Sequence, residues 1–237
     1  MHNIMQAINI VKTFGGLRAL DGVEFSVREN SITSIIGPNG SGKTTFLNCI
    51  NGIYRPDKGD IKFKGKSIVG LKPHVIARLG IGRTFQISRV FRKISVIENI
   101  LATVLDSHKP NEQLRKEAYE SLERVDMLGL KDSLGEELSG GQQKLLELLR
   151  LWIADSDLIL LDEPFSGVHP ELKTSFYKQI KELQKNGKTF ILISHDMKSI
   201  YRLSDEIIVF DLGEIIAKGA EEEIKANERV IQAYLGD

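Results

Sequence analysis

The run Gly37-Pro38-Asn39-Gly40-Ser41-Gly42-Lys43-Thr44 restricts the possible folds of this chain more than any other feature. It follows the short apolar segment 32–36 and precedes residues 45–50, which read as the start of a helix. A glycine-rich loop between a buried strand and a helix lets main-chain N–H groups surround phosphates. In such a loop Lys43 reaches the β- and γ-phosphates, and the Thr44 hydroxyl binds Mg²⁺. The sequence therefore predicts an α/β core that binds a nucleotide.

An acidic pair follows a second buried strand. Residues 158–161 are four apolar residues that run directly into Asp162 and Glu163. A continuous apolar run is typical of a central parallel strand that is covered on both faces. At the end of such a strand Asp162 would hold Mg²⁺, and Glu163 would polarise an attacking water. An acidic pair at a strand end is often only a solvated turn, but its position after the phosphate loop favours the catalytic interpretation.

Two further polar side chains end strand-like segments. His195 follows the apolar strand 189–194, at the edge where open α/β sheets bind ligands, and it would donate to a γ-phosphate oxygen. Gln86 follows residues 81–85, and its amide can bind Mg²⁺ or the attacking water in one position and release both in another. The predicted catalytic residues are Lys43, Gln86, Glu163 and His195, and the predicted metal ligands are Thr44, Gln86 and Asp162.

The segment Leu138-Ser139-Gly140-Gly141-Gln142 predicts a second phosphate-binding element. Two glycines allow backbone N–H groups to approach a ligand closely. The apolar run 145–154 that follows predicts a buried helix, and Ser139 with Gln142 fits a capping box at its start. The N-terminus of a helix favours an anion. Taken alone, the segment would also suit an ordinary capped helix.

In this order the motifs resemble those of the ATP-binding cassette (ABC) ATPases, and the resemblance covers essentially all 237 residues. It implies that residues 138–142 are the signature motif, which contacts the ATP of a second cassette. It also implies that Phe14 stacks on adenine, whereas the alternative for Phe14 is a place in the core. The implied ATP-binding residues are Phe14, Gly37, Pro38, Asn39, Gly40, Ser41, Gly42, Lys43, Thr44 and Thr45. His169 departs from the family, since many cassettes have Asp at this position.

Composition excludes several other classes of protein. Lysine plus arginine and aspartate plus glutamate number 32 each, so no overall positive field favours nucleic acid, and we expect no nucleic-acid partner. The single cysteine, Cys49, excludes a disulfide framework and predicts a core thiol. No apolar run approaches 18 residues, and the N-terminus lacks the features of a signal peptide. We expect a cytoplasmic chain, peripheral on the inner face of the membrane, with the membrane path in another polypeptide.

The pattern along the chain predicts one α/β domain, 1–237, with a mixed and mainly parallel sheet. Residues 1–86 and 151–237 would form the nucleotide-binding core with an antiparallel β subdomain, and 87–150 a helical subdomain that carries the signature. Alternating apolar residues support the antiparallel strands, and helices are expected over 96–105 and 112–127. A further helix presents an apolar stripe of Leu172, Phe176, Ile180 and Leu183.

Segments 14–20, 71–86 and 233–236 resemble the ATPase subunits of branched-chain amino-acid importers. The resemblance implies ATP and Mg²⁺ as cofactors. It implies a second cassette, transmembrane permease subunits and an extracytoplasmic substrate-binding protein as partners. Residues 88–93 are a candidate surface for docking to the membrane partner. Cassettes for urea, amides or lipopolysaccharide export are alternatives. A soluble cassette of translation or DNA repair is another, but such proteins usually carry two cassettes or a long coiled coil.

Overall fold

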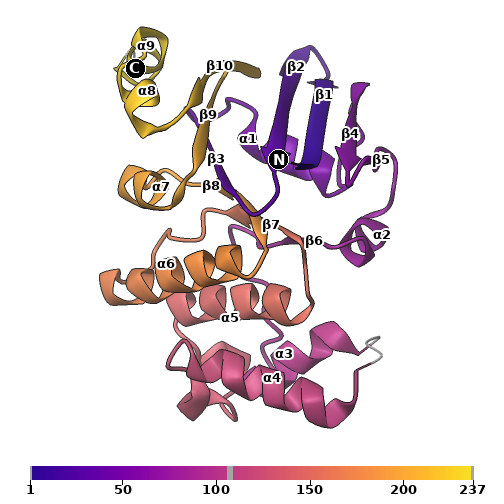
Figure 1. The fold of residues 1–237 in the computed structure, drawn as a ribbon, viewed down its shortest axis with the longest axis vertical. Helices are drawn as coiled ribbons and strands as arrows, with labels where there is room; N and C mark the ends of the chain where they lie inside the picture. Colours follow the sequence, from indigo (N-terminus) through magenta and orange to yellow (C-terminus); the bar gives the residue numbers. More distant parts are fainter. Residues whose placement is uncertain (1, 106–108, 236–237) are drawn as a thin grey trace.

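The computed structural model describes residues 2–105 and 109–235, with side chains as far as residue 233. The N-terminal part forms an antiparallel sheet of β1 (Asn3–Phe14), β2 (Leu17–Arg28), β4 (Lys58–Phe63) and β5 (Lys66–Ser67), in the order β2-β1-β4-β5 (Figure 1). Val23, Phe25 and Val27 alternate with more exposed residues along β2 and point into the core. The predicted antiparallel sheet is therefore confirmed.

The second sheet has the order β10-β9-β3-β8-β7-β6. Its strands are β3 (Ile32–Ile36), β6 (Ile81–Arg83), β7 (Leu158–Asp162), β8 (Thr189–Ile193), β9 (Glu206–Asp211) and β10 (Glu214–Gly219). All neighbours are parallel except β9 and β10. Every residue of β3, β7 and β8 is buried, and in β7 and β8 this accounts for the apolar runs 158–161 and 190–193. The mixed, mainly parallel sheet is confirmed.

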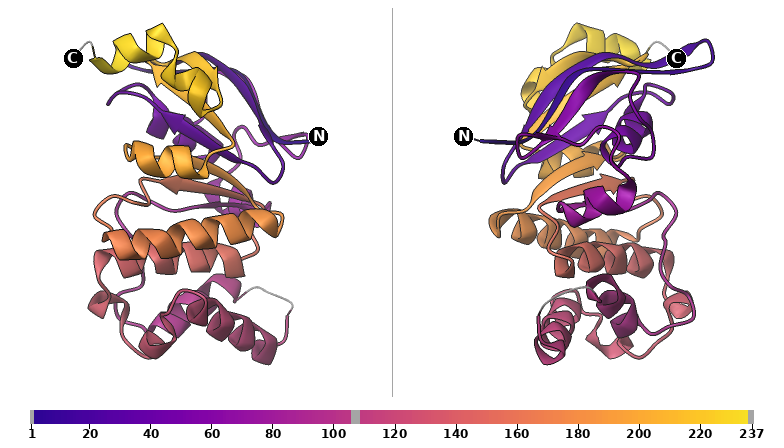
Figure 2. Two further views of the ribbon diagram at one scale, coloured as in Figure 1. Left: turned by 60° about the vertical axis from the view of Figure 1, so that its left-hand side comes forward. Right: turned by 90° about the vertical axis from the view of Figure 1, so that its right-hand side faces the viewer.

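Helices cover this sheet and extend the molecule away from it. They are α1 (Lys43–Ile50), α2 (Pro73–Arg78), α3 (Val96–Leu101), α4 (Asn111–Glu123), α5 (Gly140–Ile153), α6 (Pro170–Lys185), α7 (Met197–Leu203), α8 (Glu221–Lys225) and α9 (Glu228–Leu235). Figure 2 shows an elongated shape, with the sheets at one end, α3 and α4 at the other, and α5 and α6 between them.

Two apolar cores share the central sheet. Ile159 and Leu161 of β7 pack with the apolar faces of α3 to α7, whereas Leu158 and Leu160 pack with α1 and the antiparallel sheet. The alternation arises because successive side chains of a strand point to opposite faces. Cys49 lies in the second core as predicted, and burial raises the pKa of its thiol to about 12.

Two helices are shorter than predicted. The helix expected over 96–105 ends at Leu101 and continues as a 3₁₀ turn over Ala102–Val104. The helix expected over 112–127 ends at Glu123, and Asp126 adopts a φ of +56°, which no α-helix accommodates. In the C-terminal segment 233–236, Gly236 lies outside the described residues.

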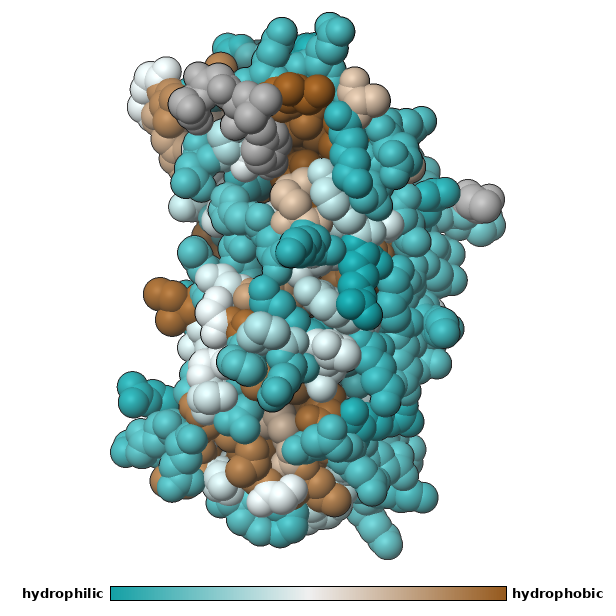
Figure 3. Space-filling view, turned by 90° about the vertical axis from the view of Figure 1, so that its left-hand side faces the viewer, coloured by the Kyte–Doolittle hydropathy of each residue, from teal (hydrophilic) through white to brown (hydrophobic). Residues whose placement is uncertain are grey.

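The surface is hydrophilic over much of the face in Figure 3, and a hydrophobic area lies toward its lower end, in the part where Figure 1 places α3 to α5. Within residues 2–105 and 109–235, no helix combines the length and the apolar character needed to span a bilayer.

The central sheet should carry much of the stability. Leu192→Ala removes a fully buried side chain of β8 and is expected to cost about 2–5 kcal/mol of unfolding free energy. The matched change Leu17→Ala, at a residue that is 70% exposed, should cost less than about 0.5 kcal/mol. Urea denaturation monitored by circular dichroism measures both, and equal losses would contradict this account of the core.

Candidate active site

The loop between β3 and α1 depends on glycines that adopt positive φ values. Gly37 and Gly42 have φ values of +149° and +103°, where residues with a side chain are strained. A Cβ atom on Gly42 would lie 2.5 Å from the Ala19 carbonyl oxygen, so the chain passes too close for any other residue. The space beside Gly40 is open, as a phosphate-binding loop requires.

Lys43 is held inside this loop. Its Nζ donates to the Gly37 and Pro38 carbonyl oxygens at 2.8 and 2.7 Å, and to Ser41 Oγ at 3.3 Å. Burial lowers the pKa of Lys43, and the carboxylates of Glu163 and Asp162 oppose that shift. The ammonium is therefore already at the site and can exchange carbonyl oxygens for phosphate oxygens.

A cavity of about 220 Å³ opens beside the loop and brings together residues from four separate segments. Gln86, Asp162, Glu163 and His195 all line it, although more than 100 residues separate Gln86 from His195 in the sequence. The remaining lining residues are Asn39, Gly40, Gly42, Lys43, Thr44, Thr45 and Ile193. Phe14 and the signature residues 138–142 do not line this cavity.

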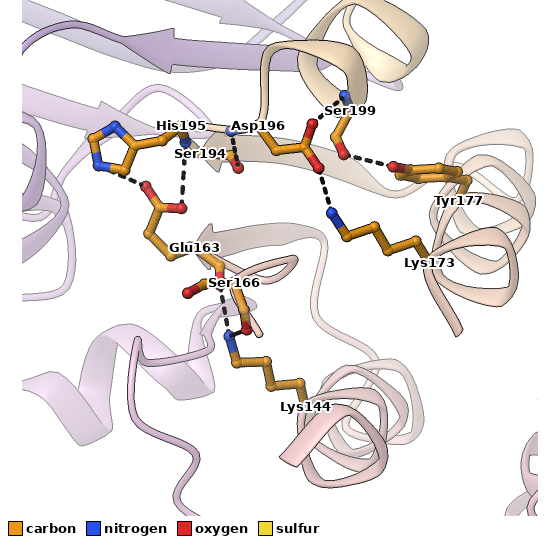
Figure 4. A network of polar contacts seen from close by, with 9 residues as sticks. All are labelled: Lys144, Glu163, Ser166, Lys173, Tyr177, Ser194, His195, Asp196 and Ser199. Carbon is orange, nitrogen blue, oxygen red and sulfur yellow. Dashed lines mark hydrogen bonds and ion pairs between the residues drawn. The ribbon is translucent and has the colours of Figure 1, made fainter. Parts of the chain in front are cut away.

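Glu163 has a strained main chain and a buried carboxylate. Its φ is +50°, and its N–H continues the parallel ladder by donating to the Ile193 carbonyl oxygen at 2.9 Å. The main-chain N–H of His195 donates to Oε2 at 3.3 Å, and His195 Nε2 lies 3.2 Å from Oε1 (Figure 4).

The Nε2–Oε1 distance suits an ion pair when the imidazole is protonated, but the contact does not have hydrogen-bond geometry. Oε1 of Glu163 consequently has no hydrogen-bond partner in the described part of the chain, which suits a group that binds water. Burial raises the pKa of Glu163, and the neighbouring His195 opposes the shift. The carboxylate is thus a stronger base than an exposed one.

Asp162 forms an ion pair that sequence reasoning missed. Arg83 Nη2 lies 3.0 Å from Asp162 Oδ2, and the two side chains are only 4% and 6% exposed. Arg83 Nη1 also donates to Asn48 Oδ1 on α1 at 2.6 Å, so one guanidinium joins β6, β7 and α1. Burial lowers the pKa of Arg83, and Asp162 opposes that shift. A charged residue inside the strand-like segment 81–85 was the available signal.

The residues present fit Mg²⁺. Thr44, Gln86 and Asp162 line one cavity and supply the hydroxyl, amide and carboxylate oxygens that this hard cation prefers. Across residues 2–105 and 109–235, no three or more His, Cys, Asp or Glu side chains form a group that could hold a metal ion.

The loop that carries His195 is fixed from α6 and α7. Asp196 caps α7 through Ser199 N–H at 3.3 Å and pairs with Lys173 of α6 at 2.6 Å, while its own N–H donates to Ser194 Oγ (Figure 4). The His195 side chain remains 58% exposed. The main chain of His195 is thus held in place, while more than half of its side chain is open to solvent at the cavity.

The signature forms the predicted helix N-terminus. Ser139 is the N-cap of α5, its Oγ accepts from Gln142 N–H at 3.4 Å, and its N–H donates to Gln142 Oε1 at 2.9 Å. Ser139 and Gly140 are exposed. The capping box is confirmed, and its exposed end lies outside the cavity that holds the other motifs.

Comparison with known proteins decides the family. Residues 20–166 match the ABC transporter family, and residues 214–237 match the branched-chain amino acid ATP-binding cassette transporter family. The chain belongs to the ABC transporter family. A relative in Archaeoglobus fulgidus, named a probable branched-chain amino acid transport ATP-binding protein, is 42% identical and covers 98% of this chain and 95% of its own.

Solved structures of ATP-binding cassettes have the same fold. One, a cassette of an ABC transporter in its ADP conformation, is 35% identical, with a TM-score of 0.90 over 100% of both chains. Another, a dimeric cassette in a post-hydrolysis state with ADP and Pi bound, is 25% identical, with a TM-score of 0.82 over 91% of this chain and 98% of its own. The predicted cassette fold is confirmed.

In this cassette, α5 also holds the segment that follows Gln86. Glu147 Oε1 accepts from the Arg89 N–H at 2.5 Å, and Arg150 Nη1 donates to the Arg89 carbonyl oxygen at 2.8 Å. Burial raises the pKa of Glu147 and lowers that of Arg150. Neither residue was predicted from the sequence to have a role, although their charges interrupt an apolar run. They tie the Gln86 segment to the signature helix.

Phe14 lies at the surface of the cassette. It is 41% exposed, its ring meets Tyr54 edge-on at 5.0 Å, and Lys12 Nζ lies 5.3 Å from its centroid. The alternative of a core phenylalanine is therefore wrong. Part of the ring is therefore open to solvent, where a ligand could contact it.

His169 is the N-cap of α6, and Pro170 follows it at the first helical position. Its side chain makes no capping hydrogen bond and is 70% exposed. An Asp at this position could accept hydrogen bonds from the first N–H groups of the helix, whereas the His169 imidazole makes no such bond and stays exposed.

The raised pKa of Glu163 has a consequence for stability. At neutral pH its buried negative charge destabilises the folded state, because folding favours the protonated form. Glu163→Gln should therefore raise the thermal unfolding midpoint at pH 7, and the gain should shrink as pH falls through the raised pKa. Differential scanning calorimetry measures it. Glu24→Gln, at an exposed carboxylate of β2, should leave the midpoint unchanged, and a lower midpoint for Glu163→Gln would contradict the assignment.

Proposed function

We propose that this cassette is the ATP-hydrolysing subunit of a transporter that imports branched-chain amino acids. One observation carries the proposal: the phosphate loop, Gln86, Asp162, Glu163 and His195 share one cavity, while the signature faces outward elsewhere. The match of residues 214–237 and the name of the Archaeoglobus fulgidus relative support the substrate class. Because the signature of this cassette lies away from its own cavity, the cavity needs the signature of a second cassette.

Hydrolysis follows from these positions. When ATP enters, Lys43 Nζ turns from the Gly37 and Pro38 carbonyl oxygens to the β- and γ-phosphate oxygens. Glu163 Oε1 accepts a hydrogen bond from the attacking water and removes its proton as the water attacks. His195 donates to a γ-phosphate oxygen. Mg²⁺, held by Thr44, Gln86 and Asp162, would neutralise phosphate charge.

Two cassettes share each site in this proposal. Ser139 and Gly140 present the exposed N-terminus of α5, which attracts the negative γ-phosphate of the partner's ATP. The dimeric cassette with ADP and Pi among the similar structures supports this arrangement. ATP then stabilises the dimer, and loss of the γ-phosphate weakens it.

Movement passes to the membrane through the helical part. Residues 87–150 act as one subdomain, 1–86 and 151–237 as the other, and the segment after Gln86 joins them. Residues 88–93 are the predicted docking surface, and Phe91 in this segment is 50% exposed. The preceding residue, Ile87, is 83% exposed. We assign this surface, extended to residues 87–93, to permease subunits, which place the cassette at the cytoplasmic face of the membrane. An extracytoplasmic binding protein delivers the amino acid.

Phe14 offers a direct test of nucleotide recognition. Stacking of a base on an aromatic ring contributes about 1–3 kcal/mol, so Phe14→Ala should weaken ATP binding by at least roughly 5-fold. Titration with ATP, followed by isothermal calorimetry, measures the change. Phe91→Ala removes a ring that is 50% exposed, from the proposed docking surface and not from the predicted adenine site, and should leave the affinity unchanged. Unchanged affinity in Phe14→Ala would remove Phe14 from the site.

The shared site predicts a dimer that depends on Ser139. Glu163→Gln keeps the shape of the base but removes its proton acceptor, so hydrolysis should slow by about 10²–10⁴ and an ATP-bound dimer should accumulate. Adding Ser139→Arg should abolish that dimer, because the larger side chain fills the space for the partner's γ-phosphate. Size-exclusion chromatography with ATP measures both variants.

The control places arginine at the other end of the same helix. Ala154→Arg, at the exposed C-cap of α5, should leave the dimer intact in the Glu163→Gln background. The single variant Ser139→Arg should bind ATP normally but hydrolyse it poorly. Native hydrolysis by Ser139→Arg would overturn the two-chain site.

A further inference from the structure

Lys144 connects the signature helix to the main chain of the catalytic base. From α5, its Nζ donates to the Glu163 carbonyl oxygen at 2.9 Å and to the Ser166 carbonyl oxygen at 2.6 Å (Figure 4). Ser139 caps the same helix five residues earlier, roughly 7.5 Å along its axis. A single side chain therefore joins the helix that carries the signature to the loop that follows β7.

The main chain that Lys144 holds adopts an unfavourable conformation. Glu163 has a φ of +50°, in the left-handed region that glycine favours. Ser166 N–H donates to the Glu163 carbonyl oxygen at 3.3 Å, so this oxygen accepts both from the other end of the turn and from Lys144. A strained conformation persists only where the surrounding structure fixes it. Lys144 supplies part of that constraint from another element.

A second contact joins the same two parts. A Cβ on Gly141 would lie 3.3 Å from Leu172 Cδ1 and 3.5 Å from Val168 Cγ1, so this signature glycine packs against the loop and the start of α6. The signature and residues 163–172 therefore touch through packing as well as through the Lys144 hydrogen bonds. If the signature moves, the Gly141 packing and the Lys144 hydrogen bonds pass the movement to Glu163.

We propose that Lys144 is a positioning residue that links the signature of this cassette to its own Glu163. When the partner's ATP binds the signature, Lys144 holds the turn at Glu163. The Glu163 carboxylate is then oriented toward the attacking water in the cassette's own site. The two ATP sites of the dimer then act together. The inference rests on the proposed two-chain site and adds a route within each chain.

Lys144→Met tests the link, because it keeps the length of the side chain and removes the donor. A misplaced catalytic group loses roughly 10²-fold per ångström, so kcat should fall by at least about 10-fold. The dissociation constant for ATP should stay within about 2-fold, since Lys144 does not line the cavity. Lys144→Arg, which keeps donors for both carbonyl oxygens, should recover most of the lost rate.

Lys181→Met is the matched control. Lys181 lies on α6 and also donates to a main-chain carbonyl oxygen, that of Leu203, at 2.7 Å, but it has no contact with the cavity. Its loss should lower the unfolding midpoint about as much as the loss of Lys144, while kcat stays native. The double variant Glu163→Gln with Lys144→Met should still form the ATP-bound dimer, because the signature itself is intact.

Three results would overturn the link: native kcat in Lys144→Met, a kcat loss that Lys144→Arg does not relieve, or loss of the ATP-bound dimer in the double variant. The last would make Lys144 a support of the signature only. Failure of the proposed function looks different, since the native chain would then hydrolyse no ATP or Ser139→Arg would hydrolyse it at the native rate.

Discussion

The parallel pairing of β7 with β8 is the constraint on which the site depends. Its register sets Asp162 opposite Ile193, and the Glu163 N–H continues the ladder to the Ile193 carbonyl oxygen. Two strands that end together place an acidic pair and His195 side by side, although 31 residues separate Asp162 from Ile193 in the sequence. A shift of one residue would turn Asp162 and Glu163 to the opposite faces of the sheet. The chemistry of the cavity therefore follows from this register.

Helix α5 is the second organising element. Its N-terminus presents the signature, Lys144 holds the catalytic turn, and Glu147 with Arg150 holds the main chain of Arg89. All three contacts run from charged side chains to main-chain groups, so they fix the path of the chain without depending on the partner side chain. Glu147 is buried, while Lys144 and Arg150 are half-buried, and a charge removed from water is costly unless it is hydrogen-bonded. Through these contacts α5 holds neighbouring segments in place as well as filling the core.

Much of the fold was predictable because its signals are local. The phosphate loop needs glycines at fixed places, the capping box needs Ser139 and Gln142 three residues apart, and continuous apolar runs mark the central strands. The ends of helices were less predictable. The helix expected to reach Leu105 ended as an α-helix at Leu101, and the one expected to reach Met127 ended at Glu123, since turn geometry and packing decide where a helix stops.

The sequence by itself determined the family, the order of the motifs and the types of side chain at the candidate site, since each depends on residues close together in the chain. Only the tertiary structure decided that Arg83 pairs with Asp162, that Lys144 reaches the Glu163 turn and that Phe14 stays at the surface. These contacts join residues 19 to 79 positions apart or depend on what covers a side chain. A charge in an apolar run indicates that a partner exists, but only the packing of α5 and the sheet shows which group it meets.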